Sequence, residues 1–209
     1  CPPPTPDYPG SVFCRDPAYI DLLADLGADI IELTGNHNND VRALYQVDSV
    51  PFTLDLYRKN GMQCYAGGVN IADAKKPLLI ENNGNKLAFI GCNSYGPLMA
   101  WATEDSSGAA PCEYQEDYLM TAQSSAIRNF RKVADAGAVI VNGSQSHVGK
   151  AMEFWNHSFI HYGLGNLFFD QPGFYITYDG FIQKHFFYQG RHISTQLLTI
   201  TLEETAKPR

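Results

Sequence analysis

Residues 30–40, IIELTGNHNND, begin as an apolar, β-branched run that stops at Gly35. Such a run favours a buried strand, and the glycine lets the chain turn where a Cβ atom would obstruct it. Three polar side chains follow within five residues: Asn36, His37 and Asp40. An amide, an imidazole and a carboxylate leaving one strand end suit a divalent metal with mixed nitrogen and oxygen ligands. His37 could instead donate a proton, and Asn and Asp are also common turn formers.

The same layout occurs a second time in the chain. LGADIIELTGNH (26–37) and AGAVIVNGSQSH (136–147) both run from a helix end through Gly-Ala, an apolar strand and a glycine to a polar loop that ends in histidine. In open α/β sheets, ligands bind beyond the carboxyl ends of the strands. We therefore expect His37 and His147 to converge on one crevice.

Apolar periodicity and turn residues predict the remaining elements. Helices are expected at 16–27, 52–61 and 124–137, each ending at a glycine, and 93–117 is expected to be mostly loop. Strands are expected at 28–34, 138–143, 182–190 and 193–204, with hairpins that turn at Asn83-Gly84 and at Asn156-His157. Helix–strand units combined with hairpins indicate a mixed-sheet α/β fold. We expect one domain over 1–209, with a proline-rich opening segment (1–15) and a core (16–203).

Composition excludes some classes of function. The chain has 209 residues, 44% of them hydrophobic, and a net charge of -7. Phosphate binding needs clustered Lys and Arg, so a nucleic-acid partner is not expected. No apolar run approaches the roughly 20 residues that span a bilayer, and no signal peptide is visible. The expectation is a cytosolic protein or one whose targeting segment has been removed.

The five cysteines match no zinc pattern, because no Cys-x2-Cys pair is present. Cys1 and Cys14 bracket the proline-rich opening segment, and a disulfide between them is plausible in an exported protein. Five unlinked thiols are the alternative.

The other histidines have simpler interpretations. His157 lies in a predicted turn and is expected to face solvent, whereas His161 alternates with apolar residues and is expected to be a hydrogen-bonded structural residue. His185 and His192 flank the terminal strands with no partner motif nearby. The glycines of YGLGNLFFD (162–170) lack the lysine of a phosphate-binding loop. They favour a tight bend beside the site, with Asn166 and Asp170 at its rim.

Four segments in this order resemble the CapA family of bacterial capsule and poly-γ-glutamate biosynthesis proteins: ELTGNHNND, the stretch GMQCYAGG to GCN, VADAGAVIVNGSQSHV and FIHYGLGNLFFDQ. The resemblance runs from about residue 17 to 172. It implies a layered α/β sandwich of the calcineurin-like metallophosphoesterase type, with metal ligands on loops at the strand ends. It also implies an extracellular or envelope-attached protein.

The resemblance assigns roles to individual residues. His37 corresponds to the catalytic histidine and Asp40 to the acidic residue that follows it. Asn36, His147 and Gln145 stand at metal-ligand positions, for Mn, Mg, Zn or Fe. Asn166 and Glu116 are implied as substrate-binding residues, Glu116 as the remainder of an acidic segment.

Departures from the family pattern shape the functional expectation. Ser144 and Gln145 stand where ligands are common, and the family's opening Gly-Asp strand is absent from this sequence. We therefore expect a degenerate site in a protein that assists synthesis or anchoring of an anionic surface polymer, alone or as an oligomer, together with the synthesis machinery. The alternatives are a metal-dependent hydrolase of phosphoester or polymer bonds and a non-catalytic assembly subunit.

Overall fold

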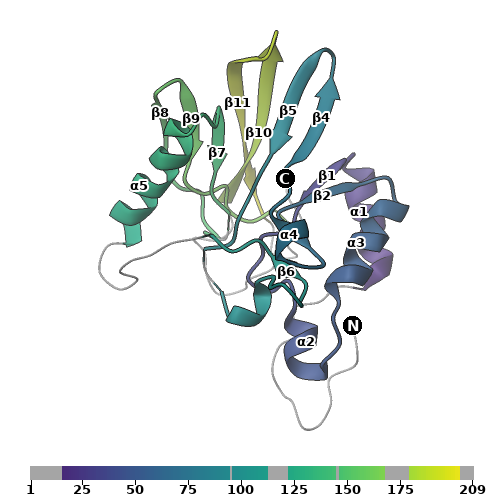
Figure 1. Ribbon diagram of the computed structural model, residues 1–209. Helices are drawn as coiled ribbons and strands as arrows, with labels where there is room; N and C mark the ends of the chain where they lie inside the picture. Colours follow the sequence, from purple (N-terminus) through teal and green to yellow (C-terminus); the bar gives the residue numbers. More distant parts are fainter. Residues whose placement is uncertain (1–15, 95, 113–121, 145, 168–178, 203–209) are drawn as a thin grey trace. The chain divides into compact units, whose positions relative to one another are not determined.

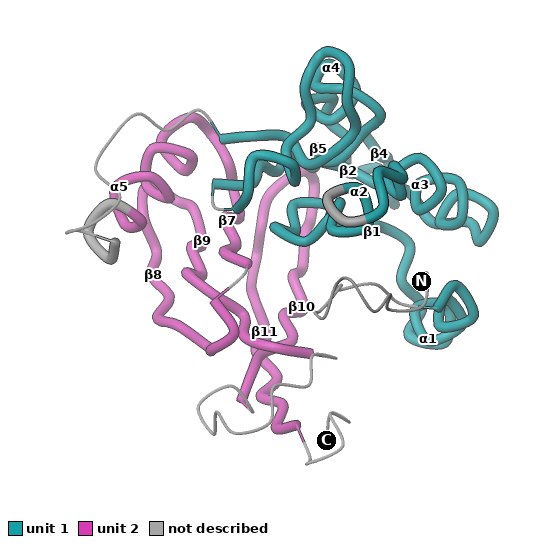
Figure 2. The backbone as a smooth tube through the Cα atoms, turned by 90° about the horizontal axis from the view of Figure 1, so that it is seen from below, with its two compact units in different colours: residues 1–115 teal, residues 116–209 magenta. Residues whose placement is uncertain are grey.

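The computed structural model describes residues 16–94, 96–112, 122–144, 146–167 and 179–202. The chain divides into two compact units, Cys1–Gln115 (unit 1) and Glu116–Arg209 (unit 2), which Figure 2 colours separately. Both units mix helices with small sheets, which confirms the mixed α/β class. The layered sandwich over the whole chain and the single domain stay predictions.

Unit 1 is built around a parallel strand pair (Figure 1). Its helical elements are η1 (Pro17–Tyr19), α1 (Ile20–Asp25), α2 (Asp40–Tyr45), α3 (Val50–Lys59), α4 (Ile71–Ala74) and η2 (Leu98–Ala100). Its strands are β1 (Ile30–Glu32), β2 (Gln63–Tyr65), β3 (Gly67–Gly68), β4 (Leu78–Asn82), β5 (Asn85–Phe89) and β6 (Gly108–Ala109). β1 pairs in parallel with β2, whereas β3–β6 and β4–β5 are antiparallel.

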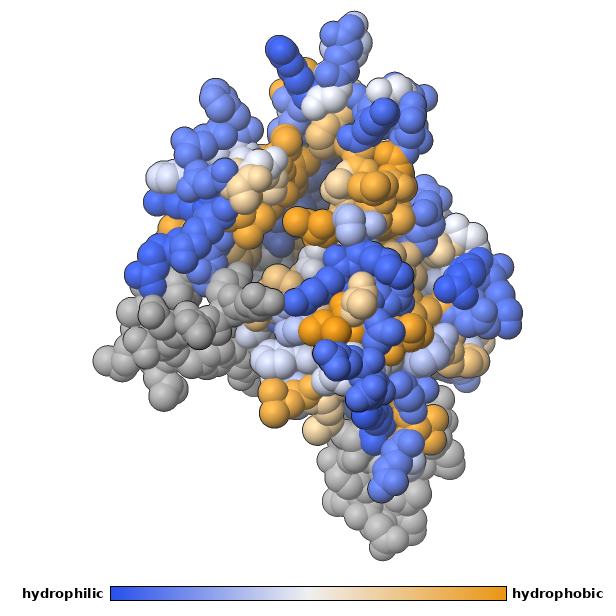
Figure 3. Space-filling model, viewed as in Figure 1, coloured by the Kyte–Doolittle hydropathy of each residue, from blue (hydrophilic) through white to orange (hydrophobic). Residues whose placement is uncertain are grey.

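The first helical segment forms where the sequence predicts it. The Asp16 side chain accepts a hydrogen bond from the Ala18 N–H, and Pro17 occupies the first helical position, where a missing N–H costs nothing. The apolar side chains of this helix, among them Tyr19 and Leu26, are nevertheless exposed. The hairpin β4–β5 also exposes Leu79, and Figure 3 shows hydrophobic surface over it.

The described residues of unit 2 form one helix, a three-stranded sheet and a long hairpin. Its elements are α5 (Ala122–Asp135), β7 (Ile140–Asn142), β8 (Met152–Trp155), β9 (Ser158–His161), β10 (Asp179–Tyr188) and β11 (Arg191–Thr201). The sheet order is β7-β9-β8, with β7 parallel and β8 antiparallel to β9, and β10 pairs with β11 alone.

Both faces of the β7-β9-β8 sheet are covered within unit 2. Ile160 is fully buried and clusters with Ala134 of α5 and Val141 of β7. On the other face, the Phe159 ring lies 6.0 Å from the ring of His185 in β10. Because neighbouring residues of a strand point to opposite faces, β9 serves as the core of both layers.

Candidate functional site

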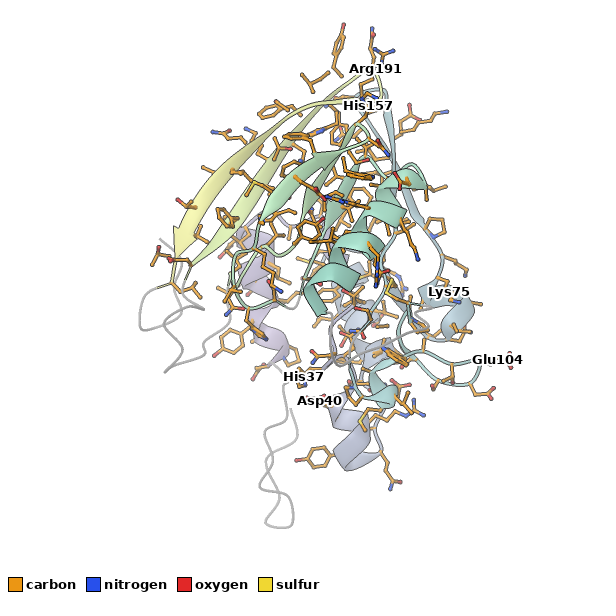
Figure 4. The ribbon with its side chains drawn as sticks, turned by 90° about the vertical axis from the view of Figure 1, so that its left-hand side faces the viewer. His37, Asp40, Lys75, Glu104, His157 and Arg191 are labelled. Atoms are coloured by element: carbon orange, nitrogen blue, oxygen red, sulfur yellow. A yellow bond between two sulfur atoms is a disulfide. The ribbon has the colours of Figure 1, made fainter. Side chains whose placement is uncertain are left out.

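The turn after β1 carries an imidazole–carboxylate pair. His37 Nδ1 lies 2.8 Å from Oδ2 of Asp40, the first residue of α2, and Figure 4 shows the two side chains next to each other. Their side chains are 45% and 15% exposed. A carboxylate only accepts, so the Nδ1 of a neutral ring carries the proton, and Nε2 becomes the nitrogen that can accept a proton or ligate a metal.

The two asparagines between His37 and Asp40 serve the fold. The Asn38 amide donates to the carbonyl of Leu33 at the end of the strand. Asn39 is fully buried, and its amide donates to the Ser107 carbonyl at 3.4 Å and to Asp48 Oδ1 at 3.4 Å. The interpretation of this stretch as turn formers therefore holds for these two residues, and they fix the backbone that presents His37.

Asn93 braces the same turn and was missed at the sequence level, where 93–117 was expected to be mostly loop. It is buried, donates from its amide to the Thr34 carbonyl, and accepts from Trp101 Nε1 at 2.8 Å. Gly96 lies against Asn36, where a Cβ atom would come within 2.9 Å of the Asn36 Cβ. The available signal was Gly-Cys-Asn directly after an apolar strand, the same layout as Thr-Gly-Asn after β1.

A disulfide between Cys92 and Cys112 secures this brace. The backbones beside it are also paired, because Asn93 N–H donates to the Ala110 carbonyl at 2.7 Å and Cys112 N–H donates to the Asn93 carbonyl at 2.9 Å. Cys64 is a free thiol. The alternative of five unlinked thiols is therefore wrong, whereas the Cys1–Cys14 hypothesis lies outside the described residues.

In unit 2, the histidine of the second loop also has its Nδ1 atom beside a side-chain oxygen. His147 Nδ1 lies 2.9 Å from Oδ1 of Asn166, a buried amide. When this amide oxygen accepts, Nδ1 of the neutral ring carries the proton and Nε2 is again the accepting nitrogen. The backbone of His147 has a φ of 52°, a left-handed conformation that is strained for a residue with a Cβ atom.

The structure thus brings the predicted residues together as two pairs. Asn166 is the hydrogen-bond partner of His147, and its role in substrate binding stays a prediction. Gln145 and Glu116 lie outside the described residues. The convergence of His37, in unit 1, with His147, in unit 2, stays a prediction.

The described residues bring together too few potential ligands for a metal ion. Among them, no group of three or more His, Cys, Asp or Glu side chains is arranged to hold an ion. A stable site for a divalent metal usually needs three or four protein ligands. One imidazole–carboxylate pair falls short of that number, so the described side chains alone do not support a chemical step through a metal.

A hollow of about 430 Å³ opens on unit 1 near the braced turn. Its lining includes Trp101, whose indole N–H binds Asn93, and Arg42, which follows Asp40 by two residues in α2. Leu98 and Met99 supply apolar surface to it. A guanidinium beside apolar and aromatic side chains can bind a carboxylate on an aliphatic chain.

The structure also shows the surroundings of the other histidines, for which the sequence predicted structural or solvent-exposed positions. His157 is exposed in the turn between β8 and β9, as expected (Figure 4). His161 is fully buried and hydrogen-bonded at both ring nitrogens, as expected of a structural residue. His185 and His192, for which the sequence showed no partner motif, both contact Thr195. A β-bulge in the hairpin, which strand alternation does not reveal, brings them together.

The fold and the two histidine loops define the class of protein. The sequence model of the family described as "Bacterial capsule synthesis protein PGA_cap" matches residues 2–127 and 113–171, and the chain belongs to this family. It is 24% identical over 176 residues to a protein named "PGA biosynthesis protein CapA" from Bacillus subtilis (strain 168). That alignment covers 73% of this chain and 45% of the relative, so the chain spans less than half of that protein's length.

Proposed function

We propose that this chain assists the synthesis or anchoring of an anionic surface polymer of the poly-γ-glutamate type, and that its two histidine pairs bind the polymer more than they hydrolyse it. Family membership and the relative's name support the polymer. The observation that carries the site is the shared arrangement of His37 and His147, in which Nδ1 lies within 2.9 Å of a side-chain oxygen. A proton on Nδ1 makes Nε2 the nitrogen that can accept a proton or bind a metal.

An exterior location is part of this proposal. The Cys92–Cys112 disulfide supports it, because such bonds persist in oxidising compartments. Among the described residues, no helix has the length and apolar character needed to cross a membrane.

The negative net charge of the chain determines what polymer binding requires. A chain with a net charge of -7 repels a polycarboxylate, so attraction must come from a bound cation or from local basic groups such as Arg42. A divalent cation held between polymer carboxylates and the Nε2 atom of His37, or of His147, would supply it, because the polymer adds the oxygen ligands that each histidine loop lacks. We therefore expect binding to depend on divalent metal.

Titration with purified poly-γ-glutamate tests this proposal. We expect at least about tenfold weaker binding when a chelator replaces Mn²⁺ or Mg²⁺, and a similar loss for His37→Ala and for His147→Ala, since each removes one ligand. His157→Ala is the matched control, because this histidine is exposed in a hairpin turn of unit 2, and it should bind like the unchanged chain. Equal affinity with and without chelator contradicts the proposal.

A metal-dependent hydrolase is the second candidate. The imidazole–carboxylate pair favours it, because an acidic residue that orients a histidine ring is a common arrangement in general acid–base catalysis. Metal analysis of the purified protein, together with phosphoesterase assays of the unchanged chain and of Asp40→Asn, separates the two. Turnover that requires metal and falls at least about a hundredfold in Asp40→Asn supports the hydrolase, whereas no bound metal and equal rates exclude it.

A further inference from the structure

Five side chains of unit 2 form a continuous hydrogen-bonded chain, here called the relay: His161, Gln183, His185, Thr195 and His192. Gln183 lies between two histidines, with its amide nitrogen at His161 Nδ1 and its oxygen 3.1 Å from His185 Nε2. Thr195 also lies between two, since its Oγ1 is 2.8 Å from His185 Nδ1 and 2.8 Å from His192 Nε2. The relay connects β9 to both strands of the hairpin β10–β11.

One backbone carbonyl fixes the direction of every hydrogen bond in the relay. His161 Nε2 lies 3.1 Å from the Lys150 carbonyl, which can only accept, so Nε2 carries the proton and Nδ1 accepts from Gln183. The Gln183 oxygen then accepts from His185 Nε2. It follows that His185 Nδ1 accepts from the Thr195 hydroxyl, which in turn accepts from His192 Nε2. In this arrangement all three rings carry a proton at Nε2, and His161 and His185 are neutral because their Nδ1 atoms accept.

A β-bulge makes the relay geometrically possible. Residues three apart in a regular strand point to opposite faces, which would separate His192 from Thr195. The register of the hairpin shifts between Phe186 and Phe187, so that His192 pairs with Phe187 while Thr195 pairs with His185. The extra residue turns His192 onto the same face as Thr195. Bulges commonly re-aim side chains in this way.

The surroundings of the relay oppose a positive charge. Burial lowers the pKa of His161, partly offset by its bond to the Lys150 carbonyl. Burial, followed by the charge of His192, lowers the pKa of His185 to about 4. If His161 took up a proton at Nδ1, that N–H would face the N–H of the Gln183 amide. The two donors would repel each other unless the amide group of Gln183 flipped. A proton on His185 would place a charge beside the Phe159 ring.

Among the described residues, no carboxylate forms a hydrogen bond or ion pair with a relay side chain to compensate such a charge. On β8, Glu153 is bound by Arg131 of α5, on the other face of the sheet. On β10, Lys184 alternates onto the exposed face, where its ammonium lies over the Phe186 ring. Asp179 and Arg191 are exposed at the ends of the hairpin strands. Asp179 alternates onto the same face as Gln183 and His185, but its carboxylate accepts from the Thr201 hydroxyl at the far end of the hairpin.

The inner end of the relay touches the segment that holds His147. The Phe181 ring packs edge-on against His161 at 5.2 Å, and its backbone N–H donates to the Leu164 carbonyl at 2.7 Å. Leu164 precedes by two residues the Asn166 that binds His147. A shift of the hairpin against β9 would therefore move Asn166 as well.

We propose that the relay is an acid-operated latch: in its neutral form it holds the hairpin β10–β11 on β9, and proton uptake releases the hairpin together with the segment that positions His147. The latch itself stands on the relay geometry. Only the functional effect of moving His147 rests on the proposed function.

Hydrogen exchange of β9, β10 and β11 amides, corrected for the intrinsic rate at each pH, tests the latch. A histidine whose pKa falls on folding contributes stability above about pH 6.5 and loses it as the pH falls. For His185 the held state should weaken by up to about tenfold per pH unit below pH 6.5, or roughly 15-fold between pH 6.5 and 5. Protection that is unchanged between pH 7 and pH 5 overturns the proposal.

Two variants distinguish a latch from a merely structural contact. Gln183→Glu places a carboxylate between His161 and His185, which favours their charged forms, so protection should rise as the pH falls and reverse the slope of the unchanged chain. Thr195→Val removes the donor that favours neutral His185, so the pKa of His185 should be lowered less and the loss of protection between pH 6.5 and pH 5 should be smaller than in the unchanged chain. Thr199→Val, on the same face of β11, is the control and should behave like the unchanged chain.

The two proposals fail in different measurements. If Gln183→Glu keeps the slope of the unchanged chain and Thr195→Val loses as much protection as the unchanged chain, the latch is wrong, whatever the polymer titration gives. Conversely, polymer binding at pH 7 that ignores the chelator removes the proposed function and leaves the exchange result standing.

Discussion

At the scale of single residues, the backbone of His147 is the clearest sign that its side chain matters to the loop. A left-handed conformation costs a residue with a Cβ atom about 1 kcal/mol or more, and glycine adopts it freely. The imidazole is retained at a position that suits glycine, and it binds the buried Asn166. Residues in such strained conformations cluster at functional sites.

This strain predicts the relative stability of two variants. Both His147→Gly and His147→Ala lose the ring, but only the alanine variant keeps the strained Cβ, so we expect the glycine variant to be more stable by about 1 kcal/mol. Urea unfolding followed by intrinsic fluorescence measures the difference. Equal stability of the two variants would show that the left-handed conformation is not maintained.

At the scale of elements, the same helix ending leads into both histidine loops. Gly27 N–H donates to the Ala24 carbonyl, and Ala28 N–H donates to the Leu23 carbonyl. Gly137 and Ala138 make the same two bonds to Ala134 and Val133 at the end of α5. Each helix then passes into a strand of a parallel pair, β1 with β2 and β7 with β9. The repeated Gly-Ala of the sequence therefore corresponds to a repeated helix–strand unit.

The two tight hairpins give an element-scale prediction. Asn156 and His157 have φ values of 44° and 69°, and Asn83 and Gly84 have φ values of 50° and 75°. Two-residue turns with positive φ at both positions favour Asn-Gly. His157→Gly should therefore stabilise unit 2 by about 0.5–1 kcal/mol. Gly84→Ala, the opposite change in the β4–β5 turn, should destabilise unit 1 by a similar amount.

Thermal unfolding of both variants checks this prediction. Polymer binding serves as the control for His157→Gly, since the substitution lies in an exposed turn and should leave the affinity unchanged. A lower transition temperature for this variant would contradict the prediction.

At the scale of the whole molecule, two small units each present one histidine loop, and their cores are modest. The alanine cluster of unit 1 consists of Ala74, Ala102 and Ala110 with Ile71 packed against it. A core of this size buries little apolar area per residue, so cross-links contribute a large share of the stability. The Cys92–Cys112 disulfide lies beside Asn93, the residue that braces the His37 turn.

Reduction of this disulfide should destabilise unit 1 by about 3 kcal/mol, because the bond closes a loop of 20 residues in the unfolded chain. Urea unfolding with and without reductant measures the loss, and unit 2 serves as the internal reference in hydrogen exchange. An unchanged unfolding midpoint for unit 1 would contradict the prediction.

Thiol counting on the denatured, unreduced protein completes that measurement. Five cysteines minus the two of Cys92–Cys112 leaves three thiols, or one if Cys1 and Cys14 are also bonded. Five reactive thiols would exclude both disulfides.

Local signals in the sequence determined most of the elements of this protein. Helix ends at Gly27 and Gly137 and turns at Asn83-Gly84 and Asn156-His157 all form where they were predicted. Each of these depends on interactions within about five residues, which a single sequence displays directly. The family, too, was visible in the order of its motifs.

Only the tertiary structure decided the partners of these residues. Asn93 reaches Thr34 across 59 positions, Asn166 reaches His147, and the relay joins β9 to β10 and β11 through a bulge that alternation cannot predict. Hydrogen bonds between side chains distant in sequence depend on how strands pair and where their register shifts. That information lies in the packing of the whole chain, because no local pattern of residue types records which distant group will satisfy a buried polar atom.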